Sequence, residues 1–106
     1  MFEGEKYITR GVQSKISLEL QIIMFQMIED LKREGIEIDY LQVFRLKKIT
    51  KNKEVIQVIE HTQEVPEYNR KIEVRIEKPV QEKVFVISSN SENRKEYSTM
   101  MIADEY

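Results

Sequence analysis

The sequence predicts an α+β fold in which one long helix packs against a curved, mainly antiparallel sheet of five to six strands. Apolar residues recur at helical spacing from Leu18 to Glu34, and after Tyr40 they alternate with polar residues in several short segments. The chain has 106 residues and only three glycines and two prolines, so no linker divides it and we expect a single domain over 1–106. The pattern also allows the sheet to close into a barrel.

The first elements are a short strand and the long helix. We expect the strand over 7–10 and its end at Gly11. The helix is predicted over about 18–34, because Ser17 can accept a hydrogen bond from an amide of the first turn and Gly35 fits the left-handed position past the last turn. Its expected core face is one broad apolar stripe, formed by Leu20, Ile23, Met24, Met27, Ile28 and Leu31.

The rest of the chain is predicted to form strands. We expect them over 41–49, 55–63, 71–77, 83–88 and 100–103, with a turn at 51–53 and a loop over 88–93. The unbroken apolar run of 84–87 predicts a central strand that is covered on both faces.

The first two of these strands form a predicted hairpin with a defined register. It places Leu46 opposite Ile59 and Arg45 opposite Glu60. It also places Lys47 opposite Val58, a mismatch that predicts a bulge.

The helix is apolar around more of its circumference than a flat sheet would cover. Leu18, Ile22 and Phe25 lie almost opposite the core stripe, beside Glu29. Either the sheet curls around the helix and buries them, or they form a surface for a protein partner, with self-association as the commonest case.

Composition excludes several classes of protein. With no cysteine, the chain has no disulfide, no thiolate zinc site and no cysteine nucleophile, and we expect a cytoplasmic location. No apolar run is long enough to span a membrane, so no membrane partner is expected. The net charge of −2 gives no overall attraction to nucleic acid.

No catalytic constellation is visible, so we expect no enzyme, no cofactor and no metal. His61 is the only histidine, and a strand would direct Glu60 and His61 to opposite faces. The chain also has no Gly-rich phosphate loop and no serine in a nucleophile-elbow pattern.

One local charge asymmetry stands out at the tip of the predicted hairpin. Five cations lie within nine residues that contain no acid: Arg45, Lys47, Lys48, Lys51 and Lys53. A basic hairpin can follow a phosphate backbone, although lysines also protect exposed hairpins from edge pairing. Weak nucleic-acid binding is therefore an alternative function.

Several segments together resemble a family of small bacterial proteins, mostly from Gram-positive bacteria, classed as a domain of unknown function. The segments are 7–13, 18–21, 39–44, 61–68, 83–87 and 103–106. The resemblance implies a bacterial cytoplasmic protein and supplies no catalytic residues.

Two of these segments are rich in polar side chains. If they meet in the fold, Arg10, His61, Glu64 and Tyr68 would line a polar pocket for a small molecule or a reaction, whereas local turn and cap hydrogen bonding is the alternative. The leading expectation is a non-enzymatic interaction protein that uses Leu18, Ile22 and Phe25.

Overall fold

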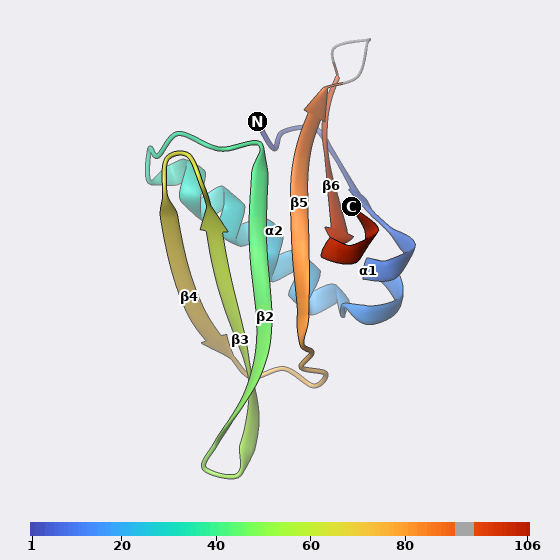
Figure 1. Cartoon of the computed structure of the whole chain (residues 1–106), viewed down its shortest axis with the longest axis vertical. Coiled ribbons are helices and arrows are strands. Elements are labelled where there is room, and N and C mark those ends of the chain that lie inside the picture. The colour runs from blue at the N-terminus through green and yellow to red at the C-terminus, as the bar shows by residue number, and fades with distance from the viewer. Residues whose placement is uncertain (91–94) are drawn as a thin grey trace.

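The computed structural model describes residues 1–90 and 95–106. Within these residues, six strands, two α-helices and one turn of 3-10 helix follow one another (Figure 1). Their bounds are β1 Glu5–Ile8, α1 Arg10–Lys15, α2 Leu18–Arg33, β2 Leu41–Lys51, β3 Glu54–Gln63, β4 Tyr68–Val74, β5 Glu82–Asn90, β6 Glu96–Ile102 and η1 Ala103–Glu105.

The strands form one mixed sheet in the order β1-β6-β5-β2-β3-β4. β1 pairs with β6 in parallel, and every other pair is antiparallel. β1 and β4 are the two edges, so the sheet is open and the barrel that the pattern allowed does not form. The predicted α+β class is confirmed.

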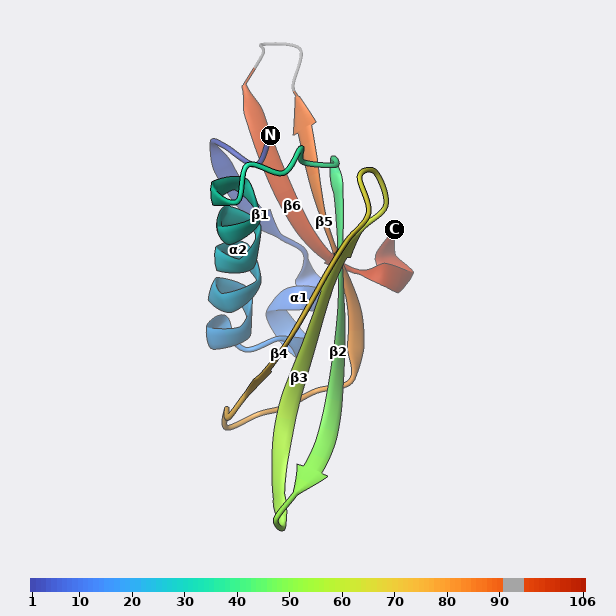
Figure 2. The same ribbon diagram turned by 90° about the vertical axis from the view of Figure 1, so that its left-hand side faces the viewer.

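Helix α2 lies across one face of the sheet (Figure 2). Ser17 caps it by accepting a hydrogen bond from the Leu20 N–H at 3.3 Å, and Gly35 follows it with a φ of +75°. The predicted stripe is buried, with Ile23 partly so, and all of it except Leu31 packs in one core with side chains from β2, β3, β5 and β6. The sheet side of this core consists of Phe44, Leu46, Ile59, Val84, Val86, Met100 and Ile102.

The β2–β3 hairpin has the predicted register. Leu46 pairs with Ile59, and Arg45 pairs with Glu60. The loop has only two residues, Asn52 and Lys53, both with positive φ, which is the backbone of a tight type I′ turn. The pairing runs without interruption, so the predicted bulge is wrong.

The Lys47–Val58 pair explains why no bulge is needed. Lys47 is exposed, whereas Val58 is buried on the same face of the sheet. A lysine can lay its aliphatic stem over an apolar neighbour while its ammonium stays in water, so the pair does not have to be separated.

Several predicted element bounds also need correction. The strand expected over 71–77 is β4, which spans Tyr68–Val74. The strand predicted over 7–10 ends at Ile8, and Arg10 begins a short helix whose N-cap Thr9 accepts from the Val12 N–H at 3.3 Å. The last strand begins at Glu96 rather than Met100. The loop expected over 88–93 is partly strand, since β5 reaches Asn90, and its remainder lies outside the described residues.

The central strand β5 is fully buried on one face and only partly covered on the other. Val84 and Val86 are fully buried under α2, whereas Phe85 and Ile87 are half-buried on the opposite face. An unbroken apolar run therefore does not require two covering layers here.

Candidate functional site

The expected interface residues of α2 lie mostly in solvent. Leu18 is 69% exposed and Ile22 is 59% exposed, so the sheet does not curl over them. Phe25 is half-buried, with the Lys6 ammonium 5.8 Å from the centre of its ring. Spaced at i, i+4 and i+7, these three side chains form one line along the helix, which we call the helix flank.

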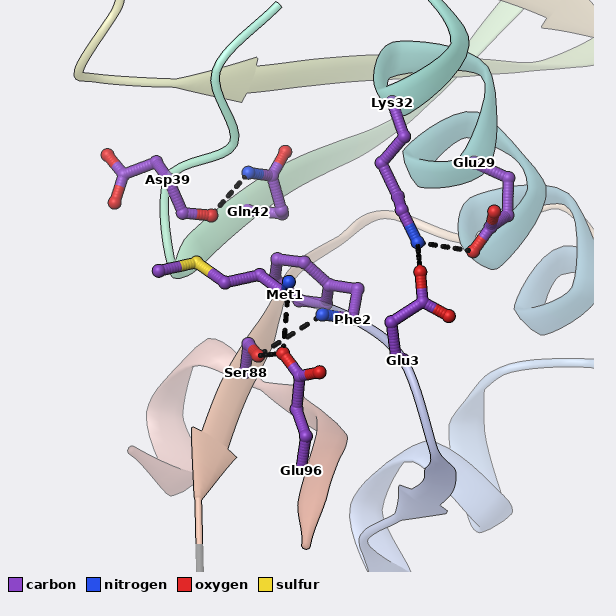
Figure 3. A network of polar contacts seen from close by, with 9 residues as sticks. All are labelled: Met1, Phe2, Glu3, Glu29, Lys32, Asp39, Gln42, Ser88 and Glu96. Atoms are coloured by element: carbon purple, nitrogen blue, oxygen red, sulfur yellow. Dashed lines mark hydrogen bonds and ion pairs between the residues drawn. The ribbon is translucent and has the colours of Figure 1, made fainter. Parts of the chain in front are cut away.

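Strand β1 lies beside the helix flank and runs in the opposite direction to α2. Lys32 near the end of α2 bridges Glu3 and Glu29, and Phe25 further back meets Lys6 (Figure 3 shows the lysine bridge). Glu3 precedes Lys6 in the chain whereas Lys32 follows Phe25, so the two contacts agree with an antiparallel arrangement of β1 and α2. Ile8 lies two strand residues beyond Lys6, or about 7 Å, which corresponds to between four and five helix residues and places it at the level of Gln21, between Leu18 and Ile22.

The outer edge of β1 has unpaired backbone groups. The Thr9 N–H donates to the Met100 carbonyl at 3.1 Å, and backbone groups alternate in direction along a strand. The N–H and C=O groups of Lys6 and Ile8 therefore point away from β6, and no described strand pairs with them. Ile8 itself is 41% exposed. Apolar side chains and free backbone groups thus form one continuous surface.

The basic hairpin does not form a single patch. Alternation places Arg45, Lys47 and Lys51 on the sheet face away from α2, Lys48 on the opposite face, and Lys53 in the turn. Lys51 is also paired with Glu73 at 2.9 Å.

The expected polar pocket is divided by the fold. Arg10 is exposed at the start of α1, which packs near β6, whereas His61 lies on β3, three strand positions away, or about 14 Å. Glu64 and Tyr68 share an open hollow of about 360 Å³ on the β3–β4 side. Tyr68 also meets the ring of His61 edge-on at 5.4 Å. The structure therefore brings together three of the four residues and leaves Arg10 apart.

His61 is a core residue. Its side chain is fully buried, and its ring stacks on Phe44 at 4.4 Å between centres. Its Nε2 lies 2.6 Å from the Gln42 oxygen, while its Nδ1 has no partner among the described residues. Burial, aided by the positive charge of Arg70, lowers the pKa of His61 to about 4. The ring is therefore neutral near pH 7 and has no path to a substrate.

Buried glutamines hold this end of the core together, and the sequence reading missed them. The Gln63 oxygen accepts from the Gln42 amide at 2.8 Å and from the Asp39 N–H at 2.9 Å. The Gln63 amide donates to the carbonyls of Glu37 and Pro66, both at 2.9 Å. The sequence did contain a signal for them, because both glutamines occupy strand positions whose side chains point to the core face of the sheet. The cluster is structural, because its donors and acceptors satisfy one another.

The described residues contain no group of three or more His, Asp or Glu side chains placed to hold a metal ion. Within the same residues, neither helix has the length and apolar character needed to cross a bilayer.

Comparisons with known proteins place the fold but not an activity. A family model described as "Staphylococcal protein of unknown function (DUF960)" matches residues 5–105. A crystal structure of a protein of unknown function from Enterococcus faecalis superposes with a TM-score of 0.67 at 21% identity. The match covers 100% of this chain and 98% of that one. No curated protein matches the sequence.

Proposed function

The chain belongs to the DUF960 family of unknown function, and we propose that it is a non-enzymatic interaction module that pairs with a second copy of itself. The interface consists of the helix flank and the outer edge of β1. One observation is the main support: two exposed apolar side chains of α2 lie beside a strand edge with unpaired backbone groups. The proposal includes a cytoplasmic location, consistent with a composition that lacks cysteine.

Both the apolar side chains and the strand edge would contribute free energy to association. Full burial of an aliphatic side chain such as Leu18 or Ile22 contributes about 1.5–3 kcal/mol relative to exposure. A free strand edge is a ready template for another strand. Both edges of the sheet bear charges, at Glu5 and Lys6 in β1 and at Arg70, Lys71 and Glu73 in β4, so it is the exposed apolar helix flank beside β1 that distinguishes the two edges.

The alternation along β1 defines the geometry of the pair. Since Lys6 and Ile8 direct their backbone groups outward, Lys6 of one copy pairs with Ile8 of the other, and Tyr7 lies at the two-fold axis. Four backbone hydrogen bonds then join two six-stranded sheets. Each α2 runs antiparallel to its own β1, so the two helices meet side by side along their flanks.

Ile22→Glu is expected to dissociate the pair. It places a carboxylate in the apolar contact, and both copies are affected, so the dissociation constant should rise at least tenfold, or about 1.4 kcal/mol. Sedimentation velocity over a range of micromolar concentrations measures this. Gln81→Glu is the control: it adds the same charge in an exposed loop near Lys48, and the mass of the protein in solution should be that of the wild type. A wild-type protein that is monomeric at every concentration would show the proposal to be wrong.

Ile8→Pro tests the strand pairing itself. Proline removes an N–H that points outward, so β1 keeps its bonds to β6 but loses one bond to the second copy at each of two symmetric positions. Two lost bonds of about 1 kcal/mol each should weaken the pair by roughly tenfold or more. Ile8→Ala removes the same side chain and retains the N–H, so it isolates the backbone effect. Equal dissociation constants for the two variants would contradict pairing through β1.

A further inference from the structure

Among the residues that the structure describes, no α-helix lies over the sheet face away from α2. In Figure 2, α2 lies on one side of the sheet, and η1 with the C-terminal end lies on the other. Val84, Val86 and Met100 point into the core, so their neighbours along β5 and β6 point outward. We call this surface the open face. Its side chains on the central strands are Leu41, Val43, Arg45, Lys83, Phe85, Ile87, Tyr97 and Met101.

Aromatic rings are gathered on one half of the open face. Tyr7 and Tyr97 meet edge-on with 5.8 Å between ring centres, and Phe85 and Tyr106 do so at 5.5 Å. Tyr7 is 52% exposed and Tyr106 is 73% exposed. A hollow of about 400 Å³ opens beside Tyr7 and Tyr97, and its lining also contains Glu5, Lys95, Glu96 and Thr99. Flat apolar rings are therefore presented to solvent from three neighbouring strands and the C-terminal residue.

Two cations next to these rings form a like-charge pair across neighbouring strands. Arg45 of β2 is directly opposite Lys83 of β5, and both point to the open face. Like charges at directly opposite positions destabilise a sheet. Lys47 follows on the same side of β2. On its other side Arg45 is opposite Glu60 of β3, donates to the Thr62 hydroxyl at 3.3 Å, and lines a hollow with Glu64 and Glu67. A polyanion laid across β2 and β5 would relieve the repulsion.

We infer that the open face binds single-stranded nucleic acid. Its phosphates would lie along Arg45, Lys47 and Lys83, and its bases would stack on Phe85, Tyr97 and their aromatic neighbours. Lys83 and Phe85 are two residues apart on one strand, about 7 Å, and the Lys83 ammonium is 5.5 Å from the centre of the Phe85 ring. Charged groups beside stacking rings are the two components of sequence-tolerant single-strand binding.

The site is the open face rather than the hairpin tip. Lys48 and Lys53 belong to the same run of cations but do not point to this face, and Lys51 is paired with Glu73. Because the whole chain has a net charge of −2, the attraction is local and steeply dependent on salt.

Binding is tested with the full chain and a fluorescein-labelled oligodeoxythymidine strand, followed by fluorescence anisotropy. We expect affinity to fall with salt with a log–log slope of about −2, as for three neutralised phosphates on a single strand. The pair of changes Arg45→Gln and Lys83→Gln should weaken binding at least tenfold and make the slope shallower by about 1.4. Tyr97→Ala should weaken it roughly tenfold through lost stacking.

Lys48→Gln with Lys53→Asn is the matched control, since it removes two charges from the same segment outside the open face. Binding should remain unchanged in this control and in Ile22→Glu, which separates the inference from the proposed pairing. No binding at low salt, or an equal loss in the control, would overturn the inference. Equally strong competition by polyglutamate would identify a general acidic-protein surface instead. If the double variant Arg45→Gln/Lys83→Gln has a smaller mass in solution than the wild type and the control does not, the open face is a contact between copies. This result, like competition by polyglutamate, would also overturn the inference.

Discussion

The free energy of unfolding should fall by about 3 kcal/mol as the pH decreases from 6.5 to 4 because of His61 alone. The pKa of His61 is about 4 in the folded chain, against 6.5 as the ordinary value. Between these values the unfolded chain binds a proton that the folded chain does not. The contribution of His61 is therefore complete above pH 6.5 and is lost progressively as the pH falls toward 4, with a limiting slope of about 1.4 kcal/mol per pH unit.

The surroundings of His61 explain why the folded chain resists the proton. The ring is fully buried against Phe44, its Nε2 hydrogen is directed at the Gln42 oxygen, and the cation of Arg70 is nearby. No carboxylate faces its unpartnered Nδ1 among the described residues. Protonation would thus place an uncompensated charge in the core.

Urea denaturation at a series of pH values measures the effect, with His61→Gln as the control. The variant has no histidine, so its stability should be nearly flat in the upper half of the window. Three carboxyl groups, those of Glu3, Asp30 and Glu105, also have lowered pKa values. Their contributions to stability are lost at lower pH than the pH at which the contribution of His61 begins to be lost. If stability falls in parallel for the two proteins between pH 6.5 and pH 5, which is about 1.5 units below the ordinary histidine pKa, the assignment to His61 is wrong.

Elements defined by local chemistry were predictable from the sequence. Helix α2 was expected over 18–34 and spans Leu18–Arg33, because its apolar period, its Ser17 cap and its Gly35 stop are all encoded within it. The β2–β3 register was equally local. It follows from a short turn whose first residue, Asn52, readily adopts positive φ.

Elements defined by distant contacts were not predictable in the same way. Helix α1 has six residues and one buried side chain, Val12, so no apolar period reveals it. It is supported by Glu105 at the other end of the chain, which accepts bonds from the Thr9 hydroxyl at 2.7 Å and the Gly11 N–H at 3.2 Å. The parallel β1–β6 pair likewise joins the two ends.

The candidate surfaces also differ in how far each could be predicted from local sequence. The helix flank could be identified because a helical projection shows every face of α2 at once. The open face could not be identified, since whether a strand's second face is covered depends on layers that the strand itself does not encode. The basic hairpin was misjudged as one patch because strand alternation distributes consecutive cations over two faces.

The segment before β1 offers a second large effect, centred on Gly4. Figure 3 shows Phe2 lying between β5 and α2, close to Ser88 and Glu96. Phe2 is only 2% exposed, and its N–H donates to the Ser88 hydroxyl at 3.2 Å. Gly4 connects this buried ring to β1 with a φ of +78°, and a Cβ there would overlap the Glu96 carbonyl of β6. The chain can therefore pass β6 at this point only without a side chain.

Gly4→Ala should accordingly lower the free energy of unfolding by about 3–4 kcal/mol: about 1 for the positive φ and about 2–3 if Phe2 leaves its place. Gly35→Ala is the matched control, because Gly35 has nearly the same φ of +75° but no atom near its would-be Cβ. It should cost only the backbone part, about 1 kcal/mol. Urea unfolding of both variants gives the difference. Equal losses would mean that backbone conformation alone matters at Gly4. A loss for Gly4→Ala that persists after Phe2→Ala would show that displacement of Phe2 is not its main source, since the two changes would then add rather than overlap.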